Sequence, residues 1–511
     1  MARSSVSSGV GYTLIVLIGI LSFRAFAGFL SPNFDADQAV HVLMAYDLQL
    51  PEDWYYWGQN RLGSLLPILS HGLLQGVPLT PIQAVSFVQY GFVIVGFLCY
   101  ASLLKRLCLR VIFALIWFLP AAPFQKLVEV AHPYAPQFAL LGIALVAAHR
   151  LARMTESILL PRMLLNTLII LSFTLSIWVS DLSLLPAGVA AVWASKSILS
   201  DHKGWRSLAH LEYLWQHPLC WYNALLLGLA GAFLVYVKST ASQRDENYGV
   251  FAINSLESMG QIIGSVLSNI VRTVLFQVHH PILSLYCLAS LVAIGSLCFY
   301  LKKVYQNTYP FSVQWLSLLL ATAISMGISI LLSRWTLIQG VPARYFIGMY
   351  LCGWLAALLT VDQLAATRQL PLGSLHRLTA LLCLTALLGS LSLPPYVFTL
   401  DKPPSRLATL QPLTTIGKAG LIGEYWSSYL LCIAAPEQLS CTPHDQDFAR
   451  CPRCVQQVLQ SPVIYLVSKG WLAAFPRELE QFGQRLRQQQ PAQPIAGYWM
   501  APYRVVSTTR Q

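Results

Sequence analysis

Apolar runs of about twenty residues recur along the whole chain, and they constrain its fold more than any other feature. A helix of that length crosses the hydrocarbon core of a bilayer with all its backbone polar groups satisfied internally. Only 11% of the residues are charged, too few to cover a soluble protein of 511 residues. We therefore predict a polytopic α-helical membrane protein. About eleven spans are expected, at 10–30, 80–104, 109–126, 133–150, 163–179, 182–195, 219–238, 281–301, 312–333, 345–362 and 378–394.

Three apolar runs allow other interpretations. The runs at 163–179 and 182–195 are short and could instead form a re-entrant pair. The run at 62–78 contains His71, Gln75 and Pro67, so we expect it to lie at the membrane interface.

The distribution of basic residues predicts the orientation. The net charge is +12, but most lysines and arginines fall in short loops between the apolar runs, which indicates membrane topology and not nucleic-acid binding. Fourteen lie on the side of the N-terminus, and seven lie on the opposite side: Arg61, Lys126, Lys238, Arg244, Arg272, Arg334 and Arg344. This bias predicts a multi-pass protein of the plasma (inner) membrane with a cytoplasmic N-terminus. Residues 1–394 would form the membrane module, with 31–79 as its first external loop, and 395–511 an extracytoplasmic tail.

Four of the eleven cysteines lie in the tail: Cys432, Cys441, Cys451 and Cys454. Outside the cytoplasm such cysteines usually form disulfides. The string CTPHDQDFARCPRC also has Cys-x2-His and Cys-x2-Cys spacings typical of metal ligands, although the spacer is short for a zinc ribbon. Disulfides, a metal site and free thiols all remain open at this point.

The tail is expected to be a small α/β domain. Helices are predicted at 407–415 and 475–490, and strands at 461–468 and 496–506. The stretch EYWSSYLLC (424–432) is predicted to be a short helix whose aromatic residues face the tail's own core, the membrane or a sugar.

The first external loop begins with the acidic stretch SPNFDADQAVHVLMAYDL (31–48). Asp35 followed by Gln38 fits a capping box, so we predict a helix that starts after Asp35. Asp37 then lies in the first turn, where the helix dipole favours a carboxylate. His41 follows on the same face. The alternative interpretation is that these acids only cap the helix.

The second half of this loop reads EDWYYWGQNRLGS (52–64) and is rich in aromatic and amide side chains. Trp and Tyr at such a position commonly anchor a membrane surface. Gln59, Asn60 and Arg61 add hydrogen-bond donors suited to sugar hydroxyls or phosphate.

These two segments resemble a known superfamily. FDADQAVHVLMAYDL followed by YYWGQNRLGSLLPIL is similar to the first external loop of the GT-C polytopic glycosyltransferases, in the branch of protein O-mannosyltransferases and the lipid A aminoarabinose transferase. HPYAPQ (132–137), PARYFIG (342–348) and GEYW (423–426) are similar in pattern. The superfamily's catalytic first-loop Asp corresponds to Asp37. Its frequent Asp-Glu pair is Asp37-Gln38 here, a departure that removes any second acid from that position.

The resemblance implies inverting transfer of a sugar from a polyprenyl-phosphate donor to an acceptor at the outer face of the membrane. Asp37 would be the general base, with Asp35 as a second catalytic candidate. Positive charge must hold the departing lipid phosphate. The residues expected to bind substrate are His41, Gln59, Asn60, Arg61, His132, Arg334, Arg344 and Tyr345. For Arg344, ordinary snorkelling at the interface is an equal alternative.

Some alternatives stay open. Asp35, Asp37 and a histidine such as His132 could bind a divalent cation, although no spacing fixes a metal site. A transporter or flippase of lipid-linked sugars would need charges deep in several spans, and apart from Arg24 they are nearly absent. The sugar and the acceptor, which could be protein, lipid or polysaccharide, are not encoded in any motif.

Overall fold

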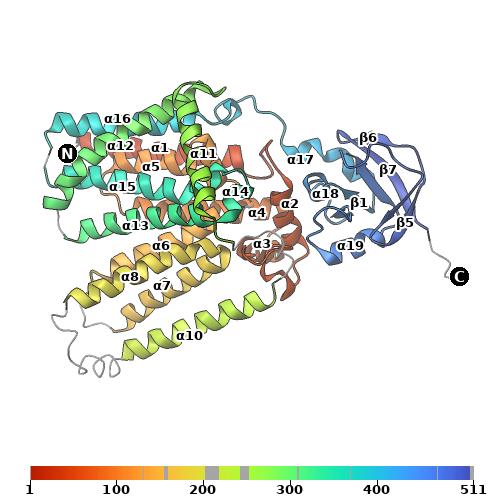
Figure 1. Ribbon diagram of the computed structural model, residues 1–511, viewed down its shortest axis with the longest axis horizontal. Coiled ribbons are helices and arrows are strands. Elements are labelled where there is room, and N and C mark those ends of the chain that lie inside the picture. The colour runs from red at the N-terminus through yellow and green to blue at the C-terminus, as the bar shows by residue number, and fades with distance from the viewer. Residues whose placement is uncertain are drawn as a thin grey trace.

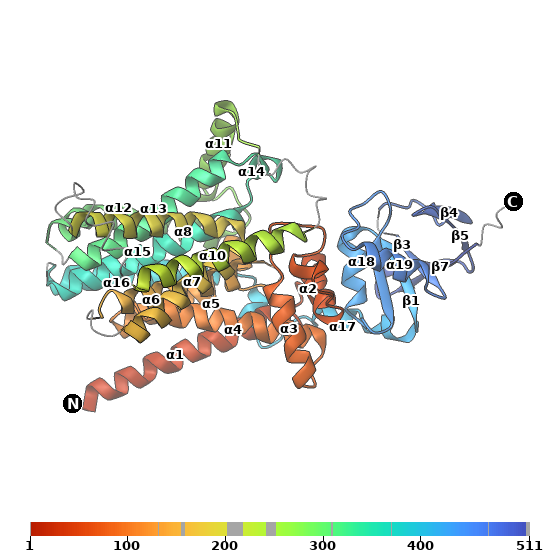
Figure 2. The same ribbon diagram turned by 90° about the horizontal axis from the view of Figure 1, so that it is seen from below.

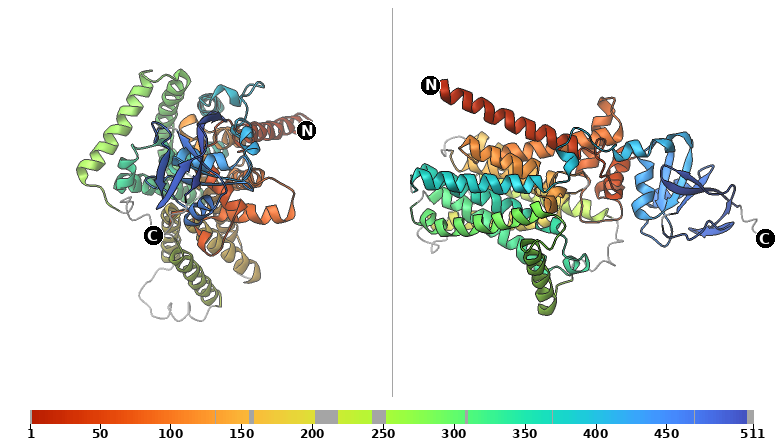
Figure 3. Two further views of the ribbon diagram at one scale, coloured as in Figure 1. Left: turned by 90° about the vertical axis from the view of Figure 1, so that its right-hand side faces the viewer. Right: turned by 90° about the horizontal axis from the view of Figure 1, so that it is seen from above.

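The molecule consists of a long helical bundle with a small sheet domain at one end (Figure 1). The structure, a computed structural model, describes residues 2–130, 132–154, 159–201, 218–241, 252–307, 310–368, 370–468 and 470–506. Of the seven basic residues predicted to lie outside, Arg244 falls outside the described residues. The N-terminus lies at the end of the bundle far from the sheet (Figure 3).

Each of the predicted spans overlaps a helix. Among the described residues, eight helices have a stretch long and apolar enough to cross a membrane, which confirms a multi-pass membrane protein. These are α1 (Ala2–Phe26), α4 (Pro81–Ala101), α7 (Leu159–Val179), α10 (Pro218–Ser239), α12 (Pro281–Asn307), α13 (Pro310–Leu332), α15 (Ile347–Ala366) and α16 (Leu372–Leu391). Three further helices overlap the remaining ranges: α5 (Leu107–Phe118), α6 (Tyr134–Leu151) and α8 (Leu184–Asp201). The count of eleven spans stays a prediction. The α7 helix starts at Leu159 and can cross alone, which does not support the re-entrant pair.

Short elements cover the end of the bundle that faces the sheet domain (Figure 2). The first loop forms α2 (Ala36–Tyr46), the 3-10 turn η1 (Glu52–Trp54) and α3 (Leu65–Gly76). With twelve residues, α3 is too short to span, in keeping with its interfacial prediction. The other short elements at helix connections are η2 (Ala122–Leu127), η3 (Asp181–Ser183), α14 (Arg334–Ile338), η5 (Ala343–Phe346) and η6 (Pro395–Val397). A longer helix, α11 (Leu256–Val274), projects from the side of the bundle (Figure 2).

A backbone hydrogen bond connects the first loop to the bundle. The Gly63 amide donates to the Trp178 carbonyl at 3.0 Å, at the end of α7. A Cβ atom on Gly63 would lie 2.4 Å from the same oxygen, so only glycine allows this contact.

The tail contains one mixed sheet in the order β2-β1-β3-β7-β5-β4, with β6 paired to β7. The first three strands in this order are mutually parallel and the rest antiparallel. The strands are β1 (Ala419–Gly423), β2 (Leu439–Pro443), β3 (Ile464–Ser468), β4 (Glu478–Gln481), β5 (Gln484–Gln488), β6 (Gln493–Ile495) and β7 (Tyr498–Val505). The accompanying helical elements are α17 (Arg406–Thr409), η7 (Gln411–Thr415), α18 (Tyr425–Cys432) and α19 (Pro452–Leu459). The strands predicted at 461–468 and 496–506 are therefore confirmed.

The helix predicted at 475–490 is wrong. This segment forms the antiparallel hairpin β4–β5. Its charged and glutamine-rich residues have good helix propensity. However, Phe482 and Gly483 both have positive φ, 51° and 71°, as a two-residue hairpin turn requires. Pairing of β5 with β7 then overrides local propensity.

All four tail cysteines form disulfides, Cys432–Cys441 and Cys451–Cys454. This outcome excludes both the metal site and the free thiols that the spacing had left open.

The tail and the first loop share one apolar core. Tyr56 and Trp57 of the loop pack with Tyr429 and Leu430 of α18. The tail is also tied to α1, because the Arg24 guanidinium donates to the carbonyls of Thr399 and Leu400. Arg24 thus reaches toward this end of the bundle. The domain division at 394 and 395 stays a prediction.

Candidate functional site

The helix predicted to start after Asp35 is α2, and Asp35 is its N-cap. The Asp35 Oδ1 atom accepts from the Gln38 amide at 3.0 Å, and the Gln38 side chain accepts from the Asp35 amide. This reciprocal pair is a capping box. It fixes where α2 begins and therefore where the carboxylate of Asp37 lies.

The second oxygen of Asp35 has a different partner. It lies 3.4 Å from Nζ of Lys126 in η2, and the same ammonium group lies 2.7 Å from the Glu129 carboxylate. Burial opposes the charge on Lys126, but Glu129 and Asp35 outweigh it and raise its pKa. Burial also raises the pKa of Glu129, which the Lys126 charge partly offsets. Asp35 therefore caps α2 and also pairs with a partly buried cation.

The Asp37 carboxylate faces the tail. Tyr425, the first residue of α18, donates its hydroxyl to Asp37 Oδ1 at 2.5 Å. Burial raises the pKa of Tyr425, and the negative charge of Asp37 raises it further despite the nearby Arg450 guanidinium. The hydroxyl thus stays protonated and can serve as a donor. Asp37 is half-buried and does not cap the helix.

Two cations come together beside this helix start. Lys126 belongs to η2 and Arg344 to η5, and these two turns pack against each other. The Arg344 guanidinium lies 5.5 Å above the ring of Tyr345. His132 lies close enough to both cations, and to His41, that their charges lower its pKa in addition to the larger effect of burial. His132 is therefore neutral near pH 7.

The lowered pKa of His132 predicts a pH-dependent loss of stability. Below pH 6.5 the imidazole of His132 takes up a proton in the unfolded chain but not in the folded chain. The free energy of unfolding therefore falls by about 1.4 kcal/mol per pH unit, until the pH reaches the lower pKa of His132 in the folded chain. A His132→Gln variant should lose less thermal stability between pH 7.5 and pH 5.5 than the wild type. His444→Gln in the tail controls for the loss of an imidazole. An equal loss in the wild type and in His132→Gln would contradict this prediction.

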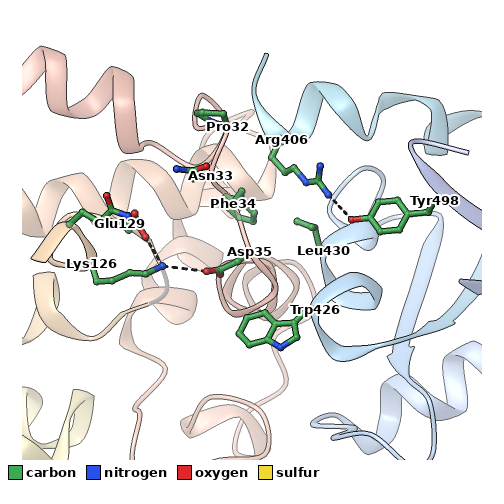
Figure 4. A pocket seen from close by; sticks show the side chains of 11 residues that line it. Pro32, Asn33, Phe34, Asp35, Lys126, Glu129, Arg406, Trp426, Leu430 and Tyr498 are labelled. Carbon is green, nitrogen blue, oxygen red and sulfur yellow. Dashed lines mark hydrogen bonds and ion pairs between the residues drawn. The ribbon is translucent and has the colours of Figure 1, made fainter. Parts of the chain in front are cut away.

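A cavity of about 490 Å³ opens between the first loop and the tail (Figure 4). One wall comes from the bundle end and contains Pro32, Asn33, Phe34, Asp35, Gln125, Lys126 and Glu129. The opposite wall comes from the tail and contains Arg406, Trp426, Leu430 and Tyr498.

The predicted site residues fall into separate groups. Asp35 pairs with Lys126, and His132 lies near Lys126, Arg344 and His41, whereas Asn60 and Arg61 contact a different part of the bundle. The Asn60 carbonyl accepts from Lys238, which also pairs with Asp181 at 3.0 Å. Arg61 stacks over Trp335 at 5.0 Å. This second cluster ties the loop to α10 and α14.

Arg334 lies apart as well. It is exposed at the start of α14, and its amide donates to the Ala252 carbonyl. Over the described ranges, no contact joins its guanidinium to the group around Lys126.

The possible metal ligands of the first loop are not grouped. Among the described residues, no three His, Cys, Asp or Glu side chains are grouped to hold one. Asp35 and Asp37 point to different partners, an ammonium and a phenol.

Several site residues escaped the sequence analysis. Glu129 lies between Val128 and Val130 and belongs to no motif, and Tyr425 was noted only within the GEYW segment and the short helix predicted at 424–432. The aromatic residues of this helix differ in exposure: Tyr425 and Tyr429 are buried, while Trp426 is 57% exposed. Asp53, Arg450 and Arg453 connect the loop to the tail across about 400 residues of sequence, and no local pattern marks them.

Comparison with known proteins supports the fold assignment. Neither a family model nor a curated protein matches the sequence. Among solved structures, ArnT from Cupriavidus metallidurans bound to undecaprenyl phosphate aligns with a TM-score of 0.60 over 97% of this chain and 98% of that one, at 11% identity. The chain has the fold of ArnT. The apo state of the same ArnT aligns with a TM-score of 0.54 and the same coverage, at 10% identity. The likeness to ArnT thus includes the tail, and the resemblance seen in the first loop is confirmed at the level of fold.

Proposed function

We propose that this chain is an integral-membrane inverting glycosyltransferase that moves a sugar from a polyprenyl-phosphate donor to an acceptor at the outer face of the membrane. The observation that carries the proposal is the start of α2, where Asp35 pairs with Lys126 of η2 and Asp37, in the first turn, accepts a hydrogen bond from Tyr425. The likeness to ArnT agrees with it, and ArnT was solved with such a lipid phosphate bound. In this proposal residues 1–394 are the catalytic module and 395–511 an extracytoplasmic domain.

The negative charge of Asp37 and the positive charges of Lys126 and Arg344 have different roles in the reaction. Asp37 takes the proton from the acceptor hydroxyl as its oxygen attacks the anomeric carbon. The bond from that carbon to the phosphate oxygen breaks, and the polyprenyl phosphate leaves with both electrons. Lys126 and Arg344 stabilise the charge on the departing phosphate. Neutral His132 can donate a hydrogen bond to the polyprenyl-phosphate sugar or accept one from it.

Lys126 is already paired with two carboxylates, which affects how phosphate would bind. The Asp35 contact is the longer, 3.4 Å against 2.7 Å for Glu129. An incoming phosphate would replace Asp35 more easily than Glu129. Asp35 would then keep its capping bond to Gln38 and hold the start of α2.

The test uses the purified full chain in detergent, where no compartments exist. Incubation with a panel of polyprenyl-phosphate sugars and saccharide, lipid and peptide acceptors should release free polyprenyl phosphate with at least one donor. A flippase of lipid-linked sugars would leave every donor chemically unchanged in detergent yet move it across reconstituted vesicles. That result would replace the transferase by the transporter alternative.

A further inference from the structure

The wall of the cavity that comes from the tail is chemically different from the wall that comes from the bundle. The carboxylates of Asp35 and Glu129 are both paired with Lys126 on the bundle side. Arg406 lies on the tail side, where its guanidinium donates to the Tyr498 hydroxyl at 2.5 Å and lies 5.8 Å from that ring. Within the described part of the chain no carboxylate pairs with Arg406. This wall therefore presents a positive charge to the cavity, and that charge favours an anionic group.

Trp426 gives the same wall an apolar face. Its side chain is 57% exposed and borders the cavity, and Leu430 lies one helical turn further along α18 (Figure 4). An indole plane packs well against the C–H face of a sugar ring through dispersion contacts. The side-chain amides of Asn33 and Gln125, on the opposite wall, can bond to hydroxyl groups.

The tail places this wall next to the proposed base. Tyr425 and Trp426 are consecutive residues in the first turn of α18, and their rings meet edge to face at 5.2 Å. Tyr425 donates to Asp37, while Trp426 borders the cavity. The cavity wall formed by Trp426 is therefore connected to the Asp37 carboxylate through the neighbouring residue Tyr425.

We propose that Trp426, Leu430 and Arg406 form the acceptor subsite, and that the acceptor is a saccharide bearing an anionic group. The sugar ring packs on Trp426 and Leu430, and the anion binds to Arg406. The assignment of the bound saccharide as an acceptor rests on the proposed transfer reaction. The binding itself can be measured without any donor or turnover.

The experiment is saturation-transfer difference NMR on the full chain in detergent, with glucose 1-phosphate, glucuronate, methyl glucoside and inorganic phosphate as probes. Transfer of saturation to the ring protons of glucose 1-phosphate or glucuronate is expected. The two probes distinguish a phosphate from a carboxylate as the preferred anion. Methyl glucoside should bind about tenfold more weakly, as loss of one charge-assisted contact predicts.

Two substitutions with matched controls complete the test. Trp426→Ala and Arg406→Gln should each weaken binding about tenfold. Trp499→Ala and Arg504→Gln should leave it unchanged, because Trp499 is equally exposed, at 57%, and neither residue lines the cavity. Unchanged binding in Trp426→Ala, equal binding of inorganic phosphate, or binding of a short acidic peptide but of no sugar would each overturn the proposal. Release of lipid phosphate by a protein that binds none of the sugar probes would remove this subsite and leave the proposed function standing.

Discussion

Replacing Asp37 with asparagine is expected to lower the rate of sugar transfer by a factor of about 10²–10⁴, because the amide cannot accept the proton of the attacking hydroxyl. The fold should not change. The Asn oxygen can still accept the hydrogen bond that Tyr425 donates to Asp37 at 2.5 Å. The measurement compares single-turnover rates of the two proteins with a saturating donor, together with their thermal denaturation midpoints.

Asp35→Asn is the matched control for this loss. Asparagine is as good an N-cap as aspartate, so α2 should start at the same place. The variant loses only the 3.4 Å ion pair with Lys126, and its rate should fall far less. Equal losses in the two variants would instead indicate that both carboxylates act together. Full activity of Asp37→Asn would eliminate Asp37 as the base.

Removing the carboxylate of Asp53 should destabilise the docking of the tail by about 3–5 kcal/mol. Asp53 is 2% exposed and binds the Arg453 guanidinium at 2.5 and 3.1 Å, and it also accepts from the indole of Trp57 at 2.9 Å. In Asp53→Ala the Trp57 indole loses its acceptor, and Arg453 keeps only its contacts with Asp47 and Glu52. We expect a lower denaturation midpoint and faster proteolysis of the segment that links the bundle to the tail.

Glu478→Ala provides the comparison, because it also removes an acid with arginine partners. Glu478 pairs with Arg485 and Arg487 on the exposed β4–β5 hairpin, where the side chains are 38–64% exposed. Such pairs contribute about 0–1 kcal/mol, so the midpoint should hardly move. If both variants lost the same stability, Asp53 would be no more than a surface ion pair.

The features that the sequence predicted are those with short-range causes. The spans follow from local apolarity, and the start of α2 follows from Asp35 and Gln38, which are three residues apart. The partner of Asp37 could not be foreseen, because Tyr425 lies 388 residues away and meets it only through docking of the tail. Arg453 and Asp53 are 400 residues apart, and their contact likewise forms only when the tail docks.

Other features depend on parts of the chain that are distant in sequence. Asn60 and Arg61 follow the acidic helix closely, yet the chain turns at Gly58, whose φ is +68°, and the Asn60 carbonyl accepts from Lys238 while Arg61 stacks over Trp335. Their role in substrate binding stays a prediction. The hairpin at 478–488 contains good helix formers. Its strand character comes from pairing with β7, which a reading of local propensity does not include.

The central claim is a single displacement at the anomeric carbon with Asp37 as a base. Its most direct test is a single-turnover reaction of the full chain with a donor labelled with carbon-13 at that carbon, followed by NMR. We predict one equivalent of polyprenyl phosphate for each glycosylated acceptor, with the anomeric configuration inverted. Retained configuration would contradict the account, because it would require a covalent sugar–enzyme intermediate and a nucleophile in place of a base.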